Sequence, residues 1–146
     1  MQVIKDIVGN KCIYVPFFLW CVVQAYKVIS ELAINKKLDM KRLVGAGGMP
    51  SSHSAVVCSL ASCIGKQYGF DSGMFAIAII MACVVMYDAA GIRRAAGKQA
   101  RVLNKILETP GLTTGEVQEK LVELLGHTPI QVFVGAVIGF VVGGLA

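Results

Sequence analysis

Four apolar stretches limit what this chain can fold into more than any other feature of its sequence. They span residues 12–34, 54–68, 74–88 and 128–146. A helix needs roughly 20 apolar residues to cross a bilayer, so the shorter stretches require shallow or thinned placement. The mean hydropathy of +0.67 lies far above that of soluble domains. The sequence therefore predicts an all-α polytopic transmembrane helical bundle of about four spans, formed by residues 1–146 as one domain.

A polar segment at about residues 92–126 separates the third apolar stretch from the fourth. It consists of a basic part at residues 92–107, a break at Thr109-Pro110-Gly111 and an amphipathic part at residues 116–125. Proline and glycine end helices, and amphipathic helices lie flat at membrane surfaces. We therefore expect this segment to be an interfacial helical hairpin inserted into the domain.

The polar motifs collect on one side of the membrane when four crossings are counted along the chain. The linker at residues 35–48, the start of the second stretch, the end of the third and the start of the fourth share that side. Ten of the 14 Lys and Arg residues lie there: Lys36, Lys37, Lys41, Arg42, Arg93, Arg94, Lys98, Arg101, Lys105 and Lys120. By the positive-inside rule, we expect an integral, multi-pass protein with this side in the cytoplasm.

The net charge of +5 raises the question of a nucleic-acid partner. Surfaces that bind single-stranded nucleic acid combine basic residues with aromatic ones, and this sequence has no such pattern. Basic residues that flank membrane spans explain the charge better. We therefore expect no nucleic-acid partner.

The sequence Gly47-Gly48-Met49-Pro50-Ser51-Ser52-His53-Ser54 opens the second apolar stretch. Pro50 suits a first helical turn, and either Ser51 or Ser52 can cap the helix. The unpaired N–H groups and the dipole of a helix start attract anions such as phosphate. His53 beside them can exchange protons near neutral pH. The simpler alternative is a serine-capped helix with a histidine at the interface.

Arg93 and Arg94 follow Asp88 at the end of the third stretch. Paired guanidinium groups match the oxygens of phosphate, although a charge pair at a membrane boundary is the simpler reading. Asp88 is an ionisable residue at the end of an apolar span, and such residues usually have a partner. That partner would be one of the arginines or a histidine.

The sequence Gly126-His127-Thr128-Pro129 places the second of the chain's two histidines before the last apolar stretch. One histidine as nucleophile and the other as general acid would suffice to cleave a phosphomonoester without a metal. No Asp, Glu and His spacing typical of a metal site occurs. We expect neither a metal nor another cofactor.

Two helical patterns lie within the apolar stretches. Lys27 shares one helix face with a glutamine and a glutamate, and a lysine buried in lipid is costly, so this face should turn inward. Its ammonium group would bind phosphate or pair with Glu31 or Asp88. Gly135, Gly139 and Gly143 recur at every fourth position, a spacing that permits close helix packing. Their face is also a candidate surface for a homo-oligomer.

These motifs resemble the phosphatidic acid phosphatase type 2 superfamily, and more closely its divergent branch of acid phosphatase/vanadium-dependent haloperoxidase-related membrane proteins. The resemblance covers nearly the whole chain. Three stretches carry it: Gly48-Met49-Pro50-Ser51-Ser52-His53-Ser54-Ala55, Met86-Tyr87-Asp88-Ala89-Ala90-Gly91-Ile92-Arg93-Arg94-Ala95-Ala96-Gly97 and Leu125-Gly126-His127-Thr128-Pro129.

The resemblance implies a role for each motif. Ser51 and Ser52 would donate hydrogen bonds to phosphate, His53 would protonate the leaving group, and His127 would attack phosphorus. An arginine that clamps phosphate would be Arg94 or Arg93, with Arg94 preferred. The remaining cradle residues would be Arg42 and either Lys27 or Lys36.

The sequence departs from the superfamily pattern in two places. A segment of 32 residues separates Arg94 from His127, which the pattern keeps close together. Gln131 stands where the superfamily has the aspartate that orients the nucleophilic histidine. In another enzyme class, replacing such a carboxylate by its amide costs about 10⁴ in rate. Asp88 is a candidate substitute from a facing helix.

We therefore expect a phosphatase that acts on a membrane lipid carrying a phosphate or pyrophosphate, through a phosphohistidine at His127. The alternative is a catalytically weak or inactive binder or carrier of anionic phospholipids. Vanadium-dependent halide oxidation is the least favoured reading, because a small membrane bundle gives no reason for it.

Overall fold

The computed structural model describes residues 1–36, 48–107 and 126–146. These residues form helices and no strand, so the all-α fold is confirmed for them. The helices are α1 (Gln2–Gly9), α2 (Lys11–Asn35), α3 (Ser52–Tyr68), α4 (Gly73–Ala90), α5 (Ile92–Leu107) and α6 (Pro129–Leu145). Each of the four apolar stretches corresponds to one helix, namely α2, α3, α4 or α6. The short helix α1 was not expected from the sequence.

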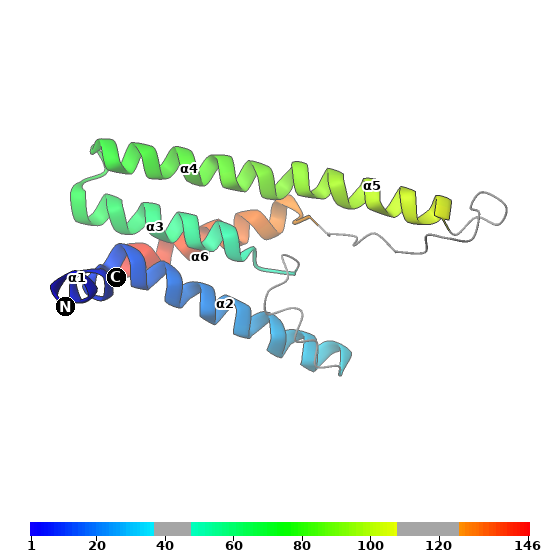
Figure 1. Ribbon diagram of the computed structural model, residues 1–146, viewed down its shortest axis with the longest axis horizontal. Helices are drawn as coiled ribbons and strands as arrows, with labels where there is room; N and C mark the ends of the chain where they lie inside the picture. Colours follow the sequence, from blue (N-terminus) through cyan, green and yellow to red (C-terminus); the bar gives the residue numbers. More distant parts are fainter. Residues whose placement is uncertain (37–47, 108–125) are drawn as a thin grey trace.

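Helix α3 is the centre of the bundle and contacts α2, α4 and α6 (Figure 1). Its buried residues are small: Ser52, Ser54, Ala55, Cys58, Ser59, Ala61, Ser62, Cys63 and Gly65. Small side chains let the neighbouring helices approach closely from several directions at once. The hydroxyl of Ser62 also donates a hydrogen bond of 2.8 Å to the backbone carbonyl of Phe140 in α6. This mixture of polar and small residues explains why α3 is the least apolar of the four predicted spans.

The glycine stripe of α6 packs directly on the backbone of α3. Gly135, Gly139 and Gly143 lie against the carbonyl groups of Ser51, Ala55 and Ser59, in that order. Both series advance by four residues in the same direction, so α3 and α6 run parallel and begin at the same end of the bundle. A Cβ atom on these glycines would collide with the α3 backbone. The face proposed for a homo-oligomer is therefore covered by α3 of the same chain.

The outer helices expose large apolar side chains. Phe17 of α2 is 64% exposed, Ile77 of α4 is 72% exposed and Phe133 of α6 is 69% exposed. By length and composition, the ranges Lys11–Ala33 and Gly73–Ile106 could each cross a membrane, and α6 is a shorter apolar helix. This surface suits a lipid environment better than water. The prediction of about four spans remains a prediction.

Helix α5 continues α4 in nearly the same direction (Figure 1). Its bounds match the basic part predicted for residues 92–107. The Thr109-Pro110-Gly111 break and the amphipathic part at residues 116–125 lie outside the described residues. The interfacial hairpin therefore remains a prediction.

Candidate functional site

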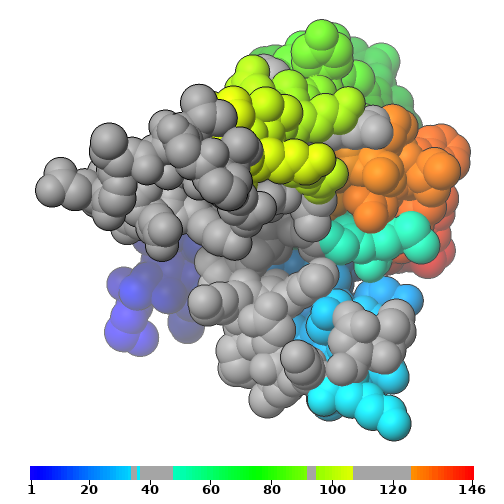
Figure 2. Space-filling view, turned by 90° about the vertical axis from the view of Figure 1, so that its right-hand side faces the viewer, coloured from blue at the N-terminus to red at the C-terminus, as the bar shows by residue number. Residues whose placement is uncertain are grey.

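One end of the bundle gathers the polar motifs, and we call it the polar end. Here α2 ends, α3 and α6 begin, and α4 passes into α5. Figure 2 looks onto this end and shows the first residues of α6, in orange, beside those that lead into α3, in teal. Two hydrogen bonds connect the start of α3 to α6 and to α2.

The start of α3 is fixed by Ser51, which is the N-cap. Its buried hydroxyl oxygen accepts hydrogen bonds from the backbone nitrogen of Ser54 at 3.4 Å and from the Ser54 hydroxyl at 3.0 Å. An N-cap residue keeps extended backbone angles, and Ser51 does so with φ −68° and ψ 113°. The helix begins only at Ser52. The expectation that Pro50 occupies the first turn is therefore wrong, because Pro50 precedes the cap.

Ser51 also joins the start of α3 to the start of α6. Its backbone N–H donates a hydrogen bond of 3.1 Å to the carbonyl oxygen of Gln131. One helical turn further along α6, Gly135 lies against the Ser51 backbone. The helix-mouth serine and the second histidine motif are far apart in sequence, and this contact makes them neighbours.

His127 lies buried just before α6, with 2% of its surface exposed. Its Nδ1 lies 3.3 Å from the side-chain oxygen Oε1 of Gln131. The same oxygen accepts a hydrogen bond of 2.9 Å from the backbone nitrogen of Thr128. Because a backbone N–H can only donate, the Gln131 amide must present its oxygen here.

This arrangement fixes the tautomer of His127. A carbonyl oxygen can only accept, so the Nδ1 that faces Gln131 carries the ring proton. In the neutral ring the lone pair then lies on Nε2, which is also buried. Gln131 thus orients the imidazole as an aspartate would, without supplying a negative charge.

Gln131 itself is held by a capping box. The Thr128 hydroxyl accepts a hydrogen bond of 3.4 Å from the backbone nitrogen of Gln131, while the Gln131 side chain caps Thr128 in return. Sequence reasoning treated Gln131 only as a replaced aspartate. The Thr-x-x-Gln spacing ahead of an apolar run was the signal that could have revealed the role of Gln131 in capping α6.

Lys27 reaches the same end from α2. Its side chain is 3% exposed, and its Nζ donates a hydrogen bond of 3.2 Å to the hydroxyl of Ser52, which is 2% exposed. A buried ammonium group in an apolar bundle is costly, so its position beside the helix mouth needs compensation by negative charge or polar partners. Because its side chain is buried, the expected inward orientation of Lys27 is confirmed.

The other candidate residues with described side chains also lie at this end, and they differ in how far their side chains are exposed. The His53 side chain is exposed on the first turn of α3, and Asp88 is half-buried in the last turn of α4. Lys36 is the exposed C-cap residue of α2. Arg93 and Arg94 belong to the first turn of α5, but their side chains are outside the described part of the structure, as is the whole of Arg42.

The polar end therefore combines a buried histidine of defined tautomer, a buried lysine and a serine-capped helix start. Across residues 1–36, 48–107 and 126–146, no group of three or more His, Cys, Asp and Glu side chains could hold a metal ion. The roles assigned to the candidate residues, and the absence of a cofactor, remain predictions.

These features define an apolar helical bundle with a polar site at one end. The chain belongs to the Divergent PAP2 family, whose sequence profile matches residues 8–142. It is also similar to the uncharacterized membrane protein YuiD of Bacillus subtilis (strain 168), with 42% identity over 127 residues and 80% of each chain covered. No solved structure matches the chain. The resemblance inferred from the sequence motifs is therefore confirmed at the level of the family.

Proposed function

We propose that this protein is an integral-membrane phosphatase of lipid phosphates or pyrophosphates that works through a phosphohistidine. One observation carries the proposal: Gln131 holds His127 in the tautomer that leaves the lone pair on Nε2. A neutral imidazole with that lone pair is the form required of a nucleophile. Membership in the Divergent PAP2 family gives independent support.

The surroundings of His127 suit a phosphate group. The start of α3 supplies backbone N–H groups and a favourable helix dipole, and Lys27 adds a buried positive charge beside Ser52. Arg94, Arg93 and Arg42 are the proposed further cations. Cations and N–H donors held in a water-poor site stabilise the charge that develops as the phosphoryl group transfers.

The proposed reaction has two steps. Nε2 of His127 attacks phosphorus, the bond to the lipid oxygen breaks, and that oxygen takes a proton from His53. Water then attacks the phosphohistidine, His53 removes a proton from it, and the bond between nitrogen and phosphorus breaks to release phosphate. The exposed position of His53 supports its part in the second step, because the incoming water must reach it.

Phosphate release from phosphatidic acid and from a polyprenyl pyrophosphate, measured in detergent, tests this mechanism. We expect turnover that tolerates EDTA, is blocked by vanadate and is lost in His127→Ala. A Gly73→Ala control at the other end of the bundle, where an added Cβ meets nothing within 4 Å, should retain full activity. Turnover that EDTA abolishes, or full activity in His127→Ala, would contradict the mechanism.

A second candidate function is a non-catalytic binder or carrier of anionic phospholipids. The observation that favours it is the amide of Gln131, which supplies no negative charge to stabilise the imidazolium that phosphoryl transfer requires. This candidate predicts lipid that copurifies with the protein and no turnover. Binding should then be lost in Arg94→Ala and retained in His127→Asn, whereas the phosphatase requires His127 for activity.

The proposed topology places the polar end in the cytoplasm. Its support is the excess of Lys and Arg at this end, and both termini lie at the opposite end of the bundle (Figure 1). An alkaline phosphatase reporter fused after Ala146 should therefore be active, because that enzyme matures outside the cytoplasm. An inactive reporter after Ala146 together with an active reporter inserted after Lys98 would reverse the orientation. A homo-oligomer, if one forms, requires a face other than the glycine stripe.

A further inference from the structure

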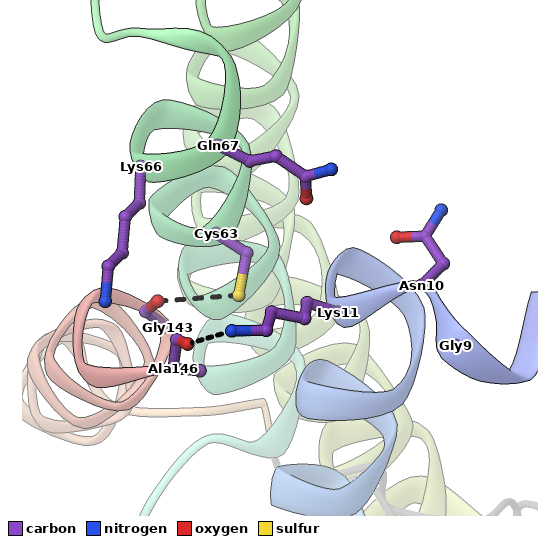
Figure 3. Close-up of a pocket in the computed structure, with 8 residues that line it drawn as sticks. All are labelled: Gly9, Asn10, Lys11, Cys63, Lys66, Gln67, Gly143 and Ala146. Atoms are coloured by element: carbon purple, nitrogen blue, oxygen red, sulfur yellow. Dashed lines mark hydrogen bonds between the residues drawn. The ribbon is translucent and has the colours of Figure 1, made fainter.

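A pocket of about 470 Å³ lies at the end of the bundle opposite the polar end (Figure 3). It is bordered by the junction of α1 and α2, the last turn of α3 and the last turn of α6. Its lining residues are Gly9, Asn10, Lys11, Cys63, Lys66, Gln67, Gly143 and Ala146. Ser51, the N-cap of α3, and Lys66 near its end are 15 positions apart, which corresponds to roughly 22 Å along the helix. This pocket is therefore separate from the proposed phosphatase site.

The pocket lining is basic and rich in hydrogen-bonding groups. It contains two lysines and two amide side chains, and no Asp or Glu side chain. Lys11 reaches from α2 toward α6 and donates a hydrogen bond of 2.8 Å to the backbone oxygen of Ala146 (Figure 3). Lys66 makes no hydrogen bond or ion pair with any other described residue and is exposed. Its ammonium group is thus the positive charge available to a ligand.

The amides add polar contacts on the other side of the pocket. Gln67 accepts a hydrogen bond from the Cys12 thiol and donates one to the Tyr68 hydroxyl. Asn10 caps the positive end of the 25-residue helix α2 here, but α3 and α6 end at the same pocket with the negative ends of their dipoles, so the charge available to an anion comes from Lys66 and not from a helix dipole. A phosphodiester, with one negative charge and several acceptor oxygens, matches this combination of groups.

The surroundings of the pocket favour a lipid over a soluble anion. Helix α1 exposes the apolar side chains of Val3, Ile4, Ile7 and Val8. On α2 and α6, which also border the pocket, Ile13 is 48% exposed and Leu145 is 79% exposed. Apolar surface of this kind beside a basic pocket is where a lipid would lay its acyl chains while its headgroup enters the pocket.

We propose that this pocket binds the phosphodiester headgroup of an anionic glycerophospholipid, with Lys66 as its charged contact. The bound lipid would belong to the membrane leaflet opposite the proposed phosphatase site. It would fill the gap between α1, α3 and α6 and hold the ends of these helices together. The lipid is a structural ligand and not a substrate, because neither histidine lies at this end.

Native mass spectrometry of the full chain in detergent tests the proposal, with palmitoyl-oleoyl phosphatidylglycerol and phosphatidylcholine as the added lipids. We expect preferential retention of phosphatidylglycerol. Lys66→Gln should reduce this preference about fivefold, and Lys66→Arg should restore it. Lys98→Gln on α5 removes the same charge from an exposed position far from the pocket and should leave the preference unchanged.

Three results would overturn the proposal. They are an unchanged preference in Lys66→Gln, an equal loss in Lys98→Gln, and displacement of the lipid by soluble sn-glycerol 3-phosphate, which would indicate a site for a free anion. If Lys66→Gln fails to fold, a photoactivatable phosphatidylglycerol can be used with the unaltered protein. Crosslinks should then map to the last turn of α3, and crosslinks found only at other helices would refute the assignment. Because both readouts measure binding, they do not depend on phosphatase activity.

Discussion

The side-chain oxygen of Gln131 lies 3.3 Å from Nδ1 of His127 and offers the ring a neutral hydrogen-bond acceptor. The same oxygen is bound to the backbone N–H of Thr128, which fixes its identity. The histidine is therefore oriented, and its tautomer is set, by a residue that belongs to the cap of α6. An aspartate would provide both orientation and negative charge, whereas Gln131 provides the orientation alone.

The neutral charge of Gln131 predicts a gain of function when a carboxylate is introduced at this position. Gln131→Glu keeps the oxygen at the position that caps α6, since glutamate serves equally well in a capping box. It adds the negative charge that stabilises an imidazolium, so phosphate release should rise by roughly tenfold or more. Steady-state phosphate release from phosphatidic acid measures the effect. Gln131→Met, which has similar size and no hydrogen-bonding acceptor at that place, should be slower than the unaltered protein.

If Gln131→Glu binds vanadate normally but shows no faster turnover, His127 is not the nucleophile or the imidazolium does not limit the rate. The binder hypothesis would be favoured if neither the variant nor the unaltered protein released phosphate.

The contact between Lys27 and Ser52 leads to a second prediction. If both side chains hold phosphate, Lys27→Gln should weaken vanadate binding by roughly 10- to 100-fold, the effect of one hydrogen bond to a charged group. Ser52→Ala should weaken it less. The double variant should lose less than the sum of the two free-energy changes, because the residues contact each other at 3.2 Å.

Isothermal titration with orthovanadate measures these affinities, and thermal unfolding checks that each variant is folded. Lys5→Gln on α1 is the matched control, since it removes the same charge at the opposite end of the bundle. Strict additivity of the two substitutions would show that Lys27 and Ser52 act on the anion independently or not at all.

The parallel packing of α3 and α6 predicts where the fold is most sensitive. In Gly139→Val, the new side chain meets the backbone of Ala55, which has no rotamer with which to move away. We expect a loss of stability of about 1–3 kcal/mol, typical of overpacking. Gly73→Ala, where nothing lies within 4 Å of the added Cβ, should be neutral or slightly stabilising. Thermal unfolding in detergent compares them, and equal stability of both variants would contradict the close packing.

The helices could be predicted from the sequence because their signals are local. The apolar run at residues 12–34 and the Ser-rich start at Ser51 each mark a helix without reference to any other part of the chain. The spacing of Gly135, Gly139 and Gly143 predicts a close contact between helices, but it does not identify the partner helix. Only the three-dimensional arrangement shows that α3 fills that role.

The residues of the candidate site could be predicted from the sequence, but the hydrogen bonds that connect them could not. Counting crossings placed Ser51 and His127 at one end, yet it could not reveal that the Ser51 N–H meets the carbonyl of Gln131. Nor could it show that Lys27 points at Ser52, because that depends on how far α2 rotates about its axis. The pocket beside Lys66 had no sequence signal, since its lining comes from four separate helix ends.

The exposed position of His53 supports a last prediction about the leaving group. A general acid matters most when the leaving oxygen is a poor one, as in the glycerol alkoxide of phosphatidic acid, and little when the oxygen leaves readily. His53→Gln should therefore lower kcat/KM for phosphatidic acid by about 10²- to 10⁴-fold and affect p-nitrophenyl phosphate much less. His127→Ala should abolish the hydrolysis of both, because the nucleophile is needed for either substrate. Parallel assays of the two substrates measure the ratio, and equal losses in His53→Gln would assign this histidine to binding instead of proton transfer.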